Sequence, residues 1–239
     1  SETIEQFRQA ALAILDQYAE VPENERQPML MILDSLGNMS SSKETTDIRD
    51  EKDTRDMTKP GLIRGTFRVL RLRLAKLAVP LIVTNHVYDQ IGAYVPTKIM
   101  SGGAGVVYVS DSVAMLSKAK DKDKDKQVIG TIVTVKMHKS RLSRENATVK
   151  VRISYKGGLD RYYGLLEAAE EAKMITGSMG RYTFPGHQKP IKAVDIAKSP
   201  ELYFTEEFLK ELDEKYIIPN FSYGLGAEIS VEEDTEDTE

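Results

Sequence analysis

Two short apolar segments that each end in polar residues constrain the fold of this chain most. Residues 29–33 run directly into Asp34 and Ser35, and residues 80–83 run into the polar residues 84–86. An apolar run of this length with a polar end is typical of a strand buried in a parallel sheet. Because a helical pattern separates the two segments, the sequence predicts a β-α-β unit with both polar ends at one edge of a sheet.

Apolar residues at helical or alternating spacing extend this pattern along the chain. Helices are predicted at residues 3–20, 62–78, 165–174 and 206–215. Further strands are predicted at residues 112–117, 128–137 and 149–155. The run KAKDKDKDK joins the first two of these strands, and its alternating charges predict a solvated hairpin tip. The expected fold class is α/β, finishing in antiparallel strands.

Cysteine is absent from the sequence, which rules out disulfides and thiolate metal sites and suits a cytoplasmic protein. No apolar stretch approaches the roughly 18 residues of a membrane span, so we expect no membrane partner. Every charged residue from Glu228 onward is acidic, and without this tail the rest of the chain is slightly positive. A run of like charge with few apolar residues predicts a disordered tail over residues 227–239.

The polar strand ends each have two interpretations when taken alone. Asp34 suits a magnesium ion held through water, since hard cations prefer oxygen ligands, but a strand-end aspartate that caps backbone amides fits as well. His86 alone equally fits an ordinary surface histidine.

Five motifs in order resemble the RecA-type recombinases, with the greatest likeness to the UvsX branch of T4-like phages. They are LMILDSLGN, LIVTNH, TKIMSGGAGVVYVSDSV, VKMHKSR and GGLDRYYGLLEAAEEA. The resemblance is close over residues 1–175 and loose beyond them. It implies a partial RecA-like ATPase core with a mixed, mostly parallel sheet flanked by helices, and a small C-terminal α/β segment. The implied domains are a core at 1–155, a C-terminal segment at 156–226 and the acidic tail at 227–239.

The resemblance also implies roles in binding ATP and Mg²⁺. Asp34 corresponds to the Walker B aspartate that holds the water shell of magnesium, and Ser35 accompanies it. His86 corresponds to the polar sensor of the γ-phosphate, so Asp34 and His86 are the candidate catalytic residues. Lys139 and Arg141 correspond to basic residues that reach across a filament interface to the ATP phosphates of the neighbouring subunit.

The same interface includes Tyr108 by resemblance. Lys139 and Arg141 are two apart on a predicted strand, so their side chains share a face and can point at one anionic group. The alternative is that both are solvent-exposed strand charges without a ligand.

Two segments, 40–59 and 87–107, correspond to the DNA-binding loops of the family. Glycines let backbone amides approach a phosphodiester closely, and basic residues neutralise phosphates. Such contacts to the DNA backbone read little sequence, as a recombinase requires. A flexible lid without DNA contact is the alternative for the glycine-rich loop. The candidate DNA-binding residues are Lys59, Arg64, Thr97, Lys98, Ser101, Gly102 and Gly103.

The phosphate-binding Walker A loop, which requires a Gly-Lys pair, has no match in this sequence. In the family that loop and the catalytic glutamate precede the Walker B strand. We therefore expect a fragment, a split-gene product or a missing half on another chain, with a degenerate paralogue as a further possibility. The chain alone is expected not to hydrolyse ATP, although the family is a DNA-dependent ATPase.

The function implied is the C-terminal portion of a phage-type homologous recombination protein, acting in DNA repair and replication. It binds single-stranded DNA as an ATP-dependent filament and promotes strand exchange, in the cytoplasm of a bacterial host. The alternative is a non-catalytic DNA-binding or filament-modulating subunit, and the DNA-loop motifs disfavour a helicase. Expected partners are single-stranded DNA, further copies of the chain, a chain with the missing half, and single-stranded-DNA-binding and mediator proteins.

Overall fold

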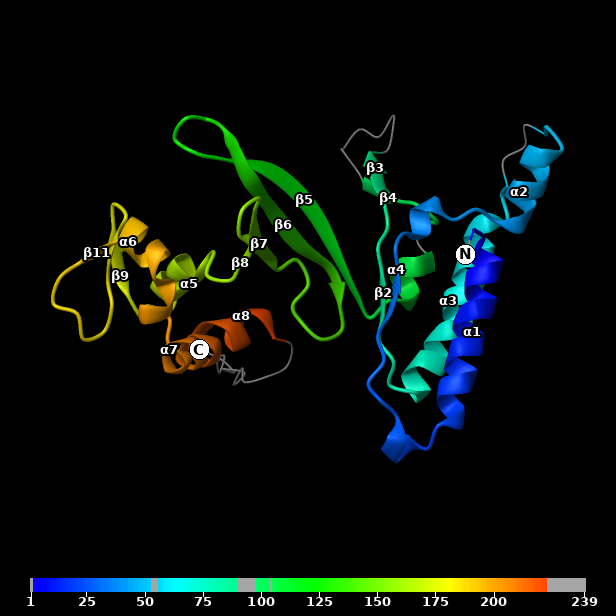
Figure 1. Cartoon of the computed structure of the whole chain (residues 1–239), viewed down its shortest axis with the longest axis horizontal. Coiled ribbons are helices and arrows are strands. Elements are labelled where there is room, and N and C mark those ends of the chain that lie inside the picture. The colour runs from blue at the N-terminus through cyan, green and yellow to red at the C-terminus, as the bar shows by residue number, and fades with distance from the viewer. Residues whose placement is uncertain (1, 53–55, 90–97, 104, 223–239) are drawn as a thin grey trace, which may run out of the picture. The chain divides into compact units, whose positions relative to one another are not determined.

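The computed structural model describes residues 2–52, 56–89, 98–103 and 105–222 (Figure 1). The predicted acidic tail and Thr97 lie outside these residues. Contacts divide the chain into two compact units, Ser1–Ser110 and Asp111–Glu239, and each is described by itself below. The domain division predicted at residues 155 and 226 came from resemblance and stays a prediction.

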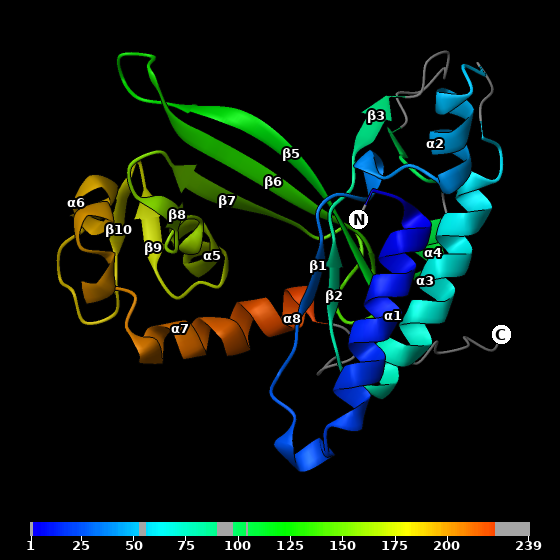
Figure 2. The ribbon, with the colours of Figure 1, turned by 45° about the vertical axis from the view of Figure 1, so that its right-hand side comes forward.

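Two long helices form one side of the unit Ser1–Ser110. Helix α1 (Ile4–Glu20) begins with a capping box, in which the Thr3 hydroxyl accepts from the Gln6 amide while the Gln6 side chain accepts from the Thr3 amide. Helix α3 (Lys59–Lys76) lies alongside α1, as Figure 2 shows. Their contact is apolar because both helices turn their periodic apolar residues inward. Its buried members include Ile4, Ala11, Leu15, Ile63, Phe67, Leu70 and Leu74.

A parallel strand pair lies against these helices. Strands β1 (Met31–Leu33) and β2 (Leu81–Val83) pair in register, which confirms the predicted β-α-β unit, although both strands are shorter than expected. Leu33 is buried in the helix-facing core. Ile32 and Ile82 are partners in the register and are 63% and 51% exposed, so the opposite face of the pair carries uncovered apolar surface.

The chain is mixed α/β, as expected, but the sheets of the described residues are small and mostly antiparallel. The predicted mostly parallel sheet is not found among them: β1 and β2 form the one parallel pair there. A parallel pair needs a crossover connection, and α3 provides the one within this part of the chain. The later strands follow one another through short connections, which favour antiparallel pairing.

The two predicted DNA-binding loops contain regular structure. The first includes α2 (Ser42–Arg49), and the second includes β3 (Val87–Asp89), β4 (Lys98–Met100) and α4 (Gly105–Val109). Strands β3 and β4 form an antiparallel hairpin. Short 3₁₀ turns at Glu23–Glu25 and Leu36–Asn38 complete the unit.

A four-stranded antiparallel sheet opens the unit Asp111–Glu239. Its strands are β5 (Ser112–Lys122), β6 (Val128–Ser140), β7 (Thr148–Ser154) and β8 (Gly158–Asp160), in that order. The charge run was predicted to be a hairpin tip, but only its second half is: residues 118–122 extend β5, and residues 123–127 form the exposed tip. The Asp123 carboxylate closes the tip by accepting from the amides of Asp125 and Gln127.

The rest of this unit is built around a separate aromatic core. It contains the helices α5 (Leu165–Glu171), α6 (Ala193–Lys198), α7 (Glu206–Leu212) and α8 (Ile218–Phe221), a 3₁₀ turn at Pro200–Leu202 and a π-turn at Asp213–Ile217. It also contains a small antiparallel sheet of β9 (Thr176–Ser178), β10 (Arg181–Thr183) and β11 (Ile191–Lys192). Phe184 contacts the rings of both Phe204 and Phe208. Among the described helices, none combines the length and apolarity that crossing a bilayer requires.

The exposed Ile32–Ile82 pair predicts self-association through this face. Replacing both residues with threonine keeps β-branched side chains in the strands and removes methyl surface from water. In analytical ultracentrifugation we expect a lower weight-average mass at high protein concentration, and we expect the melting temperature to change little. The control Leu33→Ala, which opens a cavity in the core, should instead cost about 2–5 kcal/mol of stability. Unchanged association in the double variant would contradict the prediction.

Candidate functional site

The carboxyl ends of β1 and β2 meet at one edge of the pair, as the sequence predicted. Backbone bonds from the Thr84 amide to the Leu33 carbonyl and from the Leu36 amide to the Thr84 carbonyl hold them together. The Thr84 hydroxyl donates to Asp34 Oδ1 at 2.5 Å. Ser35 Oγ and His86 Nε2 lie 3.4 Å apart. Three of the predicted nucleotide-site residues, Asp34, Ser35 and His86, are therefore neighbours.

Asp34 stands beside a cavity of about 320 Å³. Its carboxylate is exposed and one oxygen is fixed by Thr84, whereas Ser35 is buried. Across the described parts of the chain, no group of three or more His, Asp or Glu side chains is arranged to hold a metal ion directly. A single oriented carboxylate suits Mg²⁺, which commonly keeps most of its waters and binds few protein ligands. The cavity is lined by Phe7, Ile32, Leu33, Asp34, Ser35, Asn38 and Met39.

Hydrogen bonds connect the end of β2 to a turn at residues 101–103 in the second predicted DNA loop, which we call the glycine turn. Asn85 Nδ2 donates to the Ser101 carbonyl at 2.8 Å, and the Ser101 amide donates to the His86 carbonyl at 3.0 Å. Gly102 has a φ of +82°, and a Cβ atom there would lie 2.9 Å from Ile63 Cδ1. The turn therefore favours glycine at residue 102 because of its left-handed backbone conformation, and this glycine lies close to the Ile63 side chain of α3.

The glycine turn brings parts of the two predicted DNA loops together. A Cβ atom on Gly103 would lie 3.8 Å from Pro60 Cβ, in the first turn of α3, and one on Gly105 would meet the stem of Arg64. Lys59 begins the same helix. Five of the seven candidate DNA-binding residues, Lys59, Arg64, Ser101, Gly102 and Gly103, thus belong to one region of this unit. Lys98 is described only as a backbone member of β4, paired with Asp89, and Thr97 lies outside the described residues.

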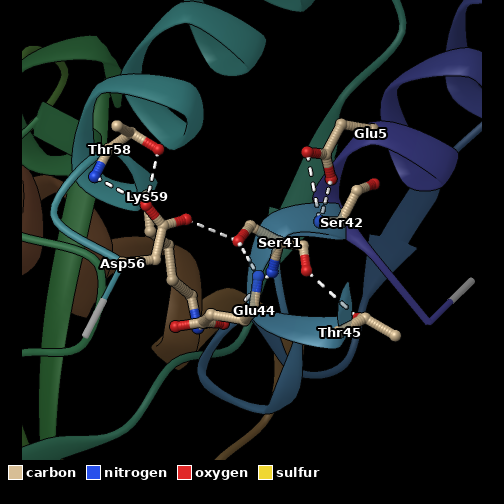
Figure 3. Close-up of polar contacts among 8 residues, drawn as sticks. All are labelled: Glu5, Ser41, Ser42, Glu44, Thr45, Asp56, Thr58 and Lys59. Carbon is tan, nitrogen blue, oxygen red and sulfur yellow. Dashed lines mark hydrogen bonds and ion pairs between the residues drawn. The ribbon is translucent and has the colours of Figure 1, made fainter. Parts of the chain in front are cut away.

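A polar cluster around the buried carboxylate of Asp56, which was not predicted from the sequence, joins the start of α2 to the start of α3 (Figure 3). Asp56 Oδ2 accepts from the Ser41 hydroxyl at 2.6 Å, and Oδ1 accepts from the amide and hydroxyl of Thr58 at 2.8 and 2.6 Å. The bond from Ser41 and then those from Thr58 lower the Asp56 pKa to about 2, against the opposing effect of burial. We call Ser41, Asp56 and Thr58 the Asp56 cluster. The pattern S-x-x-E at Ser41–Glu44 is the sequence signal that could have located it.

The candidate interface residues are described within their own units. Tyr108 lies on α4 and is 75% exposed. In the other unit β6 pairs regularly from Lys139 to Ser140, and the Arg141 amide continues this ladder by donating to the Asp111 carbonyl. The register of β6 with β5 skips residue 138. Beyond it, residues 139 and 141 are two apart along the ladder, as expected. The Arg141 guanidinium also pairs with the Asp111 carboxylate at 3.1 Å.

The lowered Asp56 pKa predicts a pH-dependent part of the stability. Because the pKa falls from 3.8 to about 2 on folding, the contribution is complete above the unfolded value and is lost as the pH falls from about 4 to 2. Asp56→Asn should lower the free energy of unfolding by about 1–2 kcal/mol at pH 7. This deficit should shrink towards pH 2 in denaturant titrations. The control Asp50→Asn, at an exposed carboxylate of the same segment, should show little deficit at any pH; a pH-independent deficit in the Asp56 variant would contradict the prediction.

Comparison with known proteins gives one informative similarity. No family model matches the chain. The chain is 30% identical over 172 residues to the "Recombination and repair protein" of Enterobacteria phage T4. The match covers 72% of this chain and 43% of the T4 protein, so the chain spans less than half the length of the curated relative that it matches. The chain is thus similar, over most of its length, to a phage recombination and repair protein.

Proposed function

We propose that this chain is the DNA-binding and filament-forming portion of a phage-type homologous recombination protein. In this proposal it binds single-stranded DNA in an ATP-dependent filament and promotes strand exchange. The observation that carries the proposal is the glycine turn at residues 101–103, which packs on the start of α3 near Lys59 and Arg64. Basic side chains beside a glycine-bearing turn suit a phosphodiester backbone. The similarity to the T4 protein supports the same role.

The strand ends suit the nucleotide part of this function. Mg²⁺–ATP, when bound, supplies the phosphoanhydride bond that is cleaved, and its cation neutralises the negative charge of the phosphate groups. Thr84 holds Asp34 in one orientation, in which the carboxylate can accept from the water shell of magnesium. His86 is near Ser35 and its backbone carbonyl accepts from Ser101. A displacement of the His86 backbone would therefore be passed to the glycine turn through a single hydrogen bond.

The sequence lacks a Gly-Lys pair, so these residues are proposed to supply only some of the nucleotide contacts. The phosphate-binding loop would come from another part of the protein or from a further chain. Lys139 and Arg141 are proposed to act on the nucleotide of an adjacent subunit. Arg141 would first leave Asp111, at little cost because that ion pair is largely exposed.

A second candidate is a non-catalytic subunit that binds DNA or modulates a filament made by another protein. The missing Gly-Lys pair favours this candidate, since such a subunit needs no phosphate-binding loop of its own. Both candidates would act in the cytoplasm of a bacterial host, with single-stranded-DNA-binding and mediator proteins as partners. They differ in whether the chain, joined to a phosphate-binding loop, turns over ATP.

Arg64 tests the DNA proposal most directly. Arg64→Gln should weaken binding to oligothymidine and to mixed-sequence single strands alike, because a phosphate contact reads no sequence. The slope of log affinity against log salt should become shallower by about 0.7. The matched control is Arg73→Gln, which removes the same charge from the far end of α3, where Arg73 pairs with Asp16. If both variants lose the same affinity for single-stranded DNA, or if neither loses any, Arg64 does not contact the DNA.

The action in trans of Lys139 and Arg141 predicts complementation. In a recombinase that carries this segment and a Walker A loop, replacing both with alanine should lower DNA-stimulated phosphate release at least about a hundredfold. Nucleotide binding to the isolated subunit should persist. Mixing this double variant with an Asp34→Ala protein should restore part of the turnover, because some interfaces then join an intact Asp34 to intact basic residues.

The control for this mixture is electron microscopy of the filaments. If mixed filaments form and remain as inactive as each variant alone, Lys139 and Arg141 do not act across the interface.

A further inference from the structure

The Asp56 cluster fixes the two ends of the first predicted DNA loop. Ser41 is the N-cap of α2 and Thr58 precedes the first residue of α3, so both helix starts are bonded to one buried carboxylate. Ser42 adds a third anchor, since its amide donates to Glu5 of α1 at 3.1 and 3.2 Å. These bonds hold the ends of the loop in place at neutral pH, where Asp56 is fully ionised.

An ion pair between Glu44 and Lys59 lies beside this cluster (Figure 3). Glu44 Oε2 accepts from Lys59 Nζ at 2.8 Å and from the Ser41 amide at 3.1 Å. The two charged side chains are 26% and 24% exposed, whereas Asp56 is buried. A partly exposed ion pair contributes little to stability, so it can open while the buried cluster stays closed.

Glu44 supplies an anion that α3 itself lacks. The first turn of α3 has no acidic residue, and Lys59 is its first residue. A lysine at this end of a helix is disfavoured by the helix dipole, and a negative group beside it relieves that cost. A DNA phosphate has the same charge as the Glu44 carboxylate and could take its place on Lys59.

We propose that Glu44 is an internal competitor for DNA, which occupies Lys59 until a phosphate of single-stranded DNA displaces it. This inference rests on the proposed function, because it assigns a regulatory contact to the same loop. Each binding event must exchange the Glu44 carboxylate for a phosphate. The exchange lowers affinity and favours ligands that bring several phosphates at once over isolated anions.

The variant Glu44→Gln removes the charge of residue 44 and keeps its capping hydrogen bond at the start of α2. Glutamine at this position still accepts from the Ser41 amide, because capping boxes use Glu or Gln, so α2 keeps its start. The expected result is about two- to fivefold tighter binding of a fluorescein-labelled oligothymidine at about 50 mM salt, measured by anisotropy on the whole chain. The advantage should shrink at about 200 mM salt, where the ion pair is screened. Circular dichroism checks that the helices are retained.

Asp50→Asn is the matched control. Asp50 lies in the same loop and forms an exposed ion pair with Lys52, so its loss changes the net charge equally without removing a partner of Lys59. If Asp50→Asn tightens binding as much as Glu44→Gln, the effect is general charge repulsion and the competitor role is overturned. If Glu44→Gln leaves binding unchanged or weakens it, Glu44 does not compete, and the role is likewise overturned.

Lys59→Gln distinguishes a failure of this inference from a failure of the proposed function. We expect it to weaken DNA binding and to abolish any gain from Glu44→Gln in the double variant. If Lys59→Gln weakens binding while Glu44→Gln has no effect, the DNA contact stands and only the competitor fails. If Lys59→Gln binds DNA as the unaltered chain does, the contact proposed at Lys59 fails, and the inference fails with it.

Discussion

The parallel backbone pairing of β1 with β2 determines where the candidate nucleotide residues of the unit Ser1–Ser110 lie. Each strand is three residues long, so the pairing holds through a few ladder bonds and the packing of Leu33 on the helices. Since both strands run in the same direction, their polar ends meet, and Asp34 lies beside Thr84. A slip by one residue would turn Leu33 to the exposed face and separate these side chains.

The same edge connects to the glycine turn through short, specific contacts. The Asn85 side-chain amide and the His86 carbonyl both bond Ser101, and a Cβ atom at Gly102 would press on the tip of the Ile63 side chain. A close-packed connection transmits small displacements, because neither partner can move without the other. The geometry therefore offers a direct route between the end of β2 and the start of α3, where the basic residues lie.

Sequence reasoning located the elements with a strong apolar period and missed those held by polar contacts. Helices α1 and α3 and strands β1 and β2 carry continuous apolar patterns, so their existence and order could be predicted. Helix α2 has almost no apolar period, and its capping box and the distant Asp56 stabilise it instead. The length of β5 was underestimated, because alternating lysine and aspartate resemble a loop, and β6 extends three residues beyond its predicted end into the polar residues 138–140. The partners of Asp56, Lys59 and Arg141 depend on tertiary contacts that no local pattern encodes.

The Asp56 cluster also has a consequence for how this region can change in sequence. Its hydrogen bonds to Ser41 and Thr58 fix the start of α2 and the start of α3, which are the two ends of a loop. The entropic free-energy cost of closing such a loop rises only by about 0.6 kcal/mol for each doubling of its length. The amides of residues 50–52 bond the last turn of α2, so insertions should be tolerated between Lys52 and Asp56, where the sequence can change in length while α2 and α3 keep their starts.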